Sequence, residues 1–145
     1  MSEHYLDHFI EAHKCQFSSA LKELLDGRKR THWIWFIFPI APGLAKSSVS
    51  RYYELSNLAE AKAFIEHAYL GKNYNQCLKA VLKHKYKKAE KIFGQDKWKF
   101  QASITIFSQV ASEHSIKKNL KDCLEHFFKG HLCKSTSKYL ESIDN

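Results

Sequence analysis

The sequence predicts an all-α fold, a single domain over residues 1–145 arranged as an irregular bundle of about six or seven helices. Three observations support this prediction. A length of 145 residues suits one ordinary domain. A hydrophobic content of 44% supplies enough apolar side chains for a packed core. With 5 glycines and 2 prolines the chain has few breakers, which favours long helices over many short strands.

The first part of the chain predicts two helices separated by a basic loop. Apolar side chains recur at helical spacings through residues 3–26, and Gly27 is placed to end that helix in the left-handed conformation. Residues 33–38 are continuously apolar and fit either a buried strand or a short, fully buried helix. We predict a helix, because no partner strand is evident and an isolated strand would leave its backbone groups unpaired.

Later helices are predicted from apolar periodicity and from the residues at their ends. Asn57 is a good N-cap for a helix that Gly71 is placed to end. Asp96 is expected to cap a further helix, with Trp98 among its apolar members. The helices expected in this part of the chain cover residues 47–53, 58–70, 73–84, 88–93, 98–111, 115–129 and 137–143.

Neither a membrane span nor a bound cofactor is expected from the sequence. No apolar run approaches the roughly 20 residues that cross a bilayer, and residues 1–4 do not resemble a signal peptide, so we expect a cytoplasmic protein. The 4 cysteines form no C-x-x-C pair, which predicts free thiols and no metal site. No nucleotide-binding glycine motif and no hydrolase motif occurs. The oligomeric state is not predicted.

The formal net charge of +8 favours an anionic partner. The densest basic run consists of Lys83, Lys85, Lys87, Lys88 and Lys91. Because this run is mostly lysine, a solvated face that only aids solubility is the alternative interpretation.

The segment from Gly27 to Trp35 is the strongest candidate for a functional site. It combines three cations, a hydroxyl, an imidazole and two indoles at the junction of two helices. If a helix begins near Thr31, its free N–H groups and positive dipole end face Arg28 and Arg30, which suits a phosphate or a carboxylate. Alternatively, the arginines pair with carboxylates while Trp33 and Trp35 belong to the core.

The pattern R-x-x-x-H-W-x-W-F-x-F-P, from Arg28 to Pro39, resembles a family of small bacterial proteins without assigned activity, often mislabelled calpastatin. The resemblance implies a single all-helical domain and no established activity. The chain departs from the family at three positions, because relatives usually carry Gln at Ile40, often Gln at His13, and often Asp at Cys133. Further matches along the chain are Glu11, Ala12, Ala20, Gly43, Leu44, Glu60, Ala61, Leu70, Gly71, Phe93, Gly94, Phe107, Phe127, Phe128, Gly130 and Thr136.

The polar residues that match the family suggest a shared cleft. Polar side chains are costly to bury without partners, so we expect several to meet in a cationic cleft between the second helix and the helix after Asp96. The alternative is a polar network that only ties helices together. The residues concerned are Arg28, Arg30, His32, Ser47, Tyr53, Lys99, Ser103 and Thr105.

Two functions are compatible with these patterns. The first is a domain, enzymatic or not, that binds a small phosphate-bearing or nucleotide-like anion. Arg28, Arg30 and Lys99 would hold the anion, with Ser47, Tyr53 and Ser103 nearby. Trp33 or Trp35 would stack on the ligand, and His32 would act as acid or base. The alternative is a non-catalytic interaction module whose Lys83–Lys91 face binds an acidic protein or nucleic acid.

Overall fold

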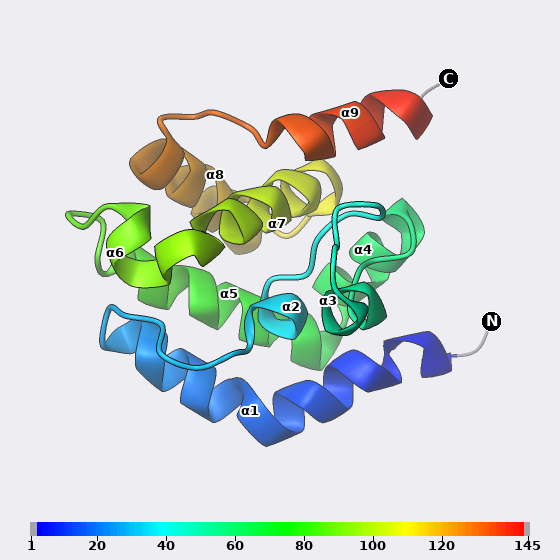
Figure 1. The fold of residues 1–145 in the computed structure, drawn as a ribbon, viewed down its shortest axis with the longest axis horizontal. Helices are drawn as coiled ribbons and strands as arrows, with labels where there is room; N and C mark the ends of the chain where they lie inside the picture. Colours follow the sequence, from blue (N-terminus) through cyan, green and yellow to red (C-terminus); the bar gives the residue numbers. More distant parts are fainter. Residues whose placement is uncertain (1–2, 144–145) are drawn as a thin grey trace.

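Helix α7 forms the centre of the fold, as seen in a computed structural model that describes residues 3–143 (Figure 1). Residues 100–107 of α7 are all buried, because α4, α6, α8 and α9 pack around this helix. On one side of α7, helix α5 packs against both α1 and α8. The elements are η1 (Glu3–Leu6), α1 (Asp7–Leu25), α2 (Ile34–Ile37), α3 (Ser48–Tyr52), α4 (Leu58–Glu66), α5 (Ala68–Leu82), α6 (Ala89–Phe93), η2 (Gly94–Asp96), α7 (Lys97–Val110), α8 (His114–Phe128) and α9 (Lys134–Ile143).

The prediction of an all-α, single-domain irregular bundle is confirmed. No strand occurs within residues 3–143, and none of the helices there is long and apolar enough to cross a membrane. The apolar run at residues 33–38 contains the short, buried helix α2 rather than a strand. Gly27 follows α1 with a φ of 82°, as predicted, and a Cβ there would come within 2.7 Å of the Lys87 ammonium nitrogen.

The helix predicted over residues 58–70 ends earlier in the structure, at Glu66. The chain breaks at His67, whose Nδ1 accepts the backbone N–H groups of Tyr69 and Leu70 at 3.1 and 3.2 Å and thereby caps α5. Gly71 lies in the first turn of α5, where a Cβ would overlap the carbonyl oxygen of Ile65. This glycine is therefore needed for the close approach of α5 to the end of α4, not to terminate a helix.

Two expectations at the start of α7 also need correction. The Asp96 side chain makes no capping hydrogen bond to α7, because its carboxylate binds two lysines instead. Trp98 is not a core residue: 59% of its surface is exposed. Helix α7 thus begins with an exposed, charged turn and becomes buried only from Phe100 onward.

Candidate functional site

The loop between α1 and α2 is folded around the carboxylate of Glu23. Oε1 of Glu23 accepts the backbone N–H groups of Arg30 and Thr31 at 2.6 and 3.0 Å, and the indole N–H of Trp33 at 2.9 Å. Its Oε2 accepts the Thr31 hydroxyl at 2.6 Å. Burial alone would raise the pKa of Glu23, but these hydrogen bonds outweigh it and lower the pKa to about 2. The carboxylate therefore acts as an internal anion that orders the loop.

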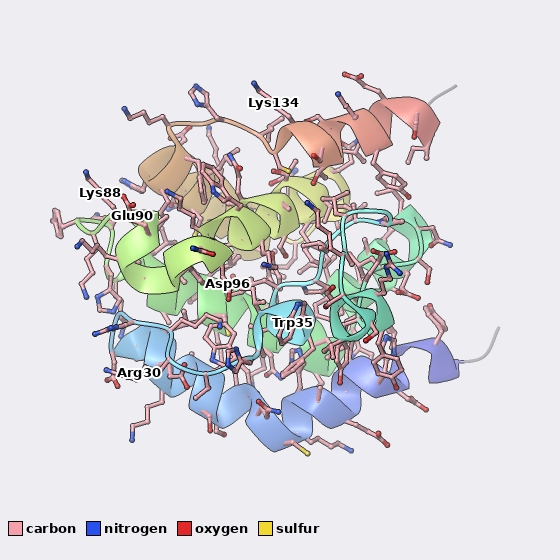
Figure 2. The ribbon with its side chains drawn as sticks, in the orientation of Figure 1. Arg30, Trp35, Lys88, Glu90, Asp96 and Lys134 are labelled. Atoms are coloured by element: carbon pink, nitrogen blue, oxygen red, sulfur yellow. The ribbon has the colours of Figure 1, made fainter. Side chains whose placement is uncertain are left out.

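Two predicted ligand-binding residues, Trp33 and Arg30, contact carboxylates of the protein in this arrangement. Trp33 is fully buried, with its indole N–H used by Glu23, so no ligand can stack on it. The Arg30 side chain points to Asp26, with its guanidinium 3.3 Å from the carboxylate at an exposed position. Figure 2 shows Arg30 near the C-terminal end of α1 and Trp35 further along, on α2.

A second carboxylate, Asp96, connects this loop to α7. Its two oxygens lie 2.9 Å from the Lys29 ammonium and 3.2 Å from the Lys99 ammonium. Burial would raise the pKa of Asp96, but the two lysines hold it below its ordinary value. The Lys29 ammonium is also 5.1 Å from the centre of the Trp33 ring. One carboxylate thus neutralises only part of the charge of two lysines, and the Lys99 side chain remains 41% exposed.

A cavity of about 460 Å³ lies next to this ion pair. Two indoles and two lysines face it: Trp35 from α2, Lys46 from the loop before α3, and Trp98 and Lys99 from the first turn of α7. The first turn of α9 also borders the cavity through Ser135. The positive ends of α7 and α9 therefore lie at the same opening as the two ammonium groups.

The floor of the cavity is apolar. Ile40, Ala45 and Ala102 are buried and pack together, with Leu44 and Cys133 against them. The Cys133 thiol is free, and the Cys133 backbone N–H donates to the Thr105 hydroxyl at 3.0 Å. Two of the positions at which the sequence departs from the family it resembles, Ile40 and Cys133, therefore line this cavity.

The structure brings three of the predicted site residues, Trp35, Ser47 and Lys99, to one cavity. His32 is exposed and stacks on Trp35 with ring centres 6.5 Å apart, but it does not line the cavity. Its predicted acid–base role stays a prediction. Arg28 does not line this cavity but a hollow beside α6.

The remaining polar residues are used inside the fold. Tyr53 packs against Phe36 with ring centres 5.2 Å apart. Ser103 is fully buried and shares a 2.9 Å hydrogen bond with Tyr74, and Thr105 donates its hydroxyl to a carbonyl of its own helix. Of the eight polar residues that match the family, Ser47 and Lys99 line the cavity, whereas Tyr53, Ser103 and Thr105 contact neighbouring groups inside the fold.

Sequence reasoning missed two of the residues that face the cavity, Trp98 and Lys46. The available signal for Trp98 is its position between Lys97 and Lys99, since an aromatic side chain between two lysines suits an exposed turn more than a core. The Lys97 ammonium indeed lies 4.7 Å from the centre of the Trp98 ring. Lys46 carries no such signal, because an isolated loop lysine is an ordinary surface residue.

The fold and this site define a small all-α protein with an open cavity between indoles and lysines. The chain belongs to the family described as "Protein of unknown function (DUF1810)", whose model matches residues 3–140. This confirms the resemblance inferred from the sequence. The chain is also similar to the conserved hypothetical protein Rv1873 from Mycobacterium tuberculosis, whose crystal structure superimposes with a TM-score of 0.87. The two are 31% identical over 92% of this chain and 94% of that one. No curated protein matches the chain.

Proposed function

We propose that the cavity beside Trp35 binds a small nucleotide-like anion, with a planar group against the indoles and a phosphate near Lys46 and Lys99. The observation that carries this proposal is the placement of two tryptophans and two lysines from separate segments around one opening. Binding sites of this kind combine apolar walls with a few placed polar groups. The volume of about 460 Å³ falls in the usual range for small-molecule sites.

The charge around the cavity supports an anionic ligand. Asp96 is shared between Lys29 and Lys99, so the group of three keeps a net positive charge. Lys46 adds a second cation at the rim. An incoming phosphate could approach the exposed Lys99 ammonium while Asp96 stays with Lys29, whose side chain is only 8% exposed.

The apolar surfaces support a ligand with a flat, weakly polar body. Trp98 is 59% exposed, so a large part of its indole surface faces solvent and is open to a ligand. The buried floor of Ile40, Ala45 and Ala102 offers no hydrogen bond from its side chains. A base or another aromatic ring would cover the indoles, with each base–aromatic contact contributing about 1–3 kcal/mol.

The test is a titration of the protein with AMP, dAMP, ATP and inorganic phosphate, followed by tryptophan fluorescence and thermal shift. We expect saturable quenching by the nucleotides, because Trp35 and Trp98 face the cavity. Lys99→Ala and Trp98→Ala should each weaken nucleotide binding about tenfold or more, which is the loss expected for one charge-assisted hydrogen bond or one stacking contact.

Lys121→Ala is the matched control, since Lys121 is an exposed lysine on α8 outside the cavity lining. It should bind nucleotides like the wild type. The proposal is overturned if no nucleotide gives a signal at millimolar concentration, or if Lys121→Ala weakens binding as much as Lys99→Ala.

A further inference from the structure

Two further hollows follow the cavity beside Trp35 along the start of α7 and α6. The second hollow, of about 760 Å³, shares Trp98 and Lys99 with the first. The third, of about 570 Å³, shares Glu90, Lys91 and Gly94 with the second. Because each pair of neighbours has lining residues in common, the three hollows adjoin one another along the surface, and we name them together the basic groove.

The lining of the basic groove is strongly cationic. Beyond Lys99, its charged side chains include Lys97, Lys91, Lys87 and Arg28. Glu90 is the one carboxylate among the lining residues of the three hollows within the described chain, and it lies 3.7 Å from Lys97. Figure 2 shows Glu90 beside Lys88 on the α6 side of the molecule. Arg28 and Lys91 form no ion pair within residues 3–143.

Gly94 keeps the groove open between its second and third hollows. It is exposed, and no atom lies within 4 Å of the place that a Cβ would occupy. Its φ of 61° turns the chain sharply between α6 and η2 without placing a side chain across the path. An extended ligand can therefore pass from Trp98 to Arg28 along a nearly continuous row of cations.

We propose that the natural occupant is the end of a single-stranded oligonucleotide, an inference that rests on the proposed function. The terminal nucleotide enters the indole cavity, and the following phosphates lie along Lys97, Lys91 and Arg28. A mononucleotide would leave the far cations of the groove without a partner. A single strand supplies unpaired bases for the indoles together with evenly spaced phosphates, which a duplex or an acidic peptide does not combine.

The experiment compares dAMP with an unlabelled oligo-dA of about ten nucleotides, a length within the range that single-strand sites cover. Tryptophan fluorescence serves as the readout for both ligands at about 50 and 200 mM salt. We expect the oligonucleotide to bind at least about thirtyfold more tightly than dAMP at the lower salt, with a steep salt dependence. The double variant Arg28→Glu, Lys91→Glu should reduce this advantage to a few-fold. The slope of the logarithm of the binding constant against the logarithm of the salt concentration should also become shallower by at least about 1.4. Each phosphate contact on a single strand contributes about 0.7 to this slope, and the variant removes two cations.

The matched control is Lys117→Glu, Lys121→Glu, which changes the net charge equally on the exposed face of α8. It should keep the preference for the oligonucleotide. If dAMP binds and oligo-dA binds no more tightly, this inference fails while the proposed function stands; if neither ligand binds, both fail. Equal loss in the control overturns the groove assignment. Displacement of oligo-dA by poly-glutamate at equal charge concentration overturns the nucleic-acid assignment in favour of an acidic protein.

Discussion

The turn around Glu23 is built from neighbouring residues, whereas the cavity beside Trp35 gathers residues from distant parts of the chain, and the two regions use their polar groups differently. In the turn, a carboxylate that is 8% exposed accepts four hydrogen bonds from Arg30, Thr31 and Trp33. At the cavity, the Lys99 side chain is 41% exposed and shares its carboxylate with a second lysine. Buried groups with all partners inside the protein stabilise the fold, whereas partly neutralised groups beside an opening remain available to a ligand.

Removing the Glu23 carboxylate is the largest change that this comparison predicts. Glu23→Ala should lower the free energy of unfolding by about 3–5 kcal/mol, because the Trp33 N–H and the loop donors lose their acceptor while Trp33 stays buried. The measurement is urea denaturation followed by far-UV circular dichroism.

Glu23→Gln provides the control, since it keeps an acceptor oxygen near Arg30 and Trp33 and should cost clearly less than the alanine variant. A loss below about 1 kcal/mol for Glu23→Ala would contradict the structural role assigned to this turn. Glu23→Ala should reduce nucleotide binding only in proportion to the fraction of the protein that unfolds.

The next largest effect is expected from His13, which makes the free energy of unfolding depend on pH. It is 1% exposed; its Nε2 donates to the Phe36 carbonyl at 2.8 Å and its Nδ1 accepts from the Asn73 amide at 3.0 Å. Burial lowers the pKa of His13 from the ordinary 6.5 to about 4. The folded state thus binds fewer protons than the unfolded one, so stability is full above pH 6.5 and falls by about 3 kcal/mol as the pH drops toward 4.

Urea denaturation of the wild type and of His13→Gln between pH 7 and pH 4 measures this contribution. Glutamine does not titrate, so the variant should show a flatter dependence on pH in this interval. Glu23 contributes in a lower interval, because its pKa is lowered from 4.5 to about 2 and its stabilising effect is lost only as the pH falls through that range. Identical pH dependence in the two proteins would exclude His13 as the titrating group.

The helices could be predicted from the sequence, but one boundary and most of the site could not. Apolar periodicity locates α1, α7 and α8 because each buries a face against the core. The break at His67 comes with a close approach of Gly71 to the Ile65 carbonyl, which only the folded backbone reveals.

The residues of the site, like the break at His67, depend on contacts that the sequence does not show. Trp35, Ser47 and Lys99 are among the predicted site residues and line one cavity. Trp33 is fully buried and Trp35 is not, and no spacing rule in the sequence distinguishes the two. Whether an arginine faces a ligand or an aspartate likewise depends on which carboxylates the fold places beside it. Arg30 illustrates this, because Asp26 lies one helical turn before it in the sequence.

Arg30→Ala is the smallest expected effect and the sharpest contrast with Lys99→Ala. The Arg30 side chain is 54% exposed and forms a 3.3 Å ion pair with Asp26, so its removal should change the free energy of unfolding by no more than about 0.5 kcal/mol. The backbone N–H of Arg30 keeps its bond to Glu23 in the variant, so the loop should not reorganise. AMP affinity should therefore stay within about twofold of the wild type, an energy of roughly 0.4 kcal/mol. A tenfold loss of AMP affinity in Arg30→Ala would place the anion site at the turn rather than at the cavity, and the division between the two regions would have to be redrawn.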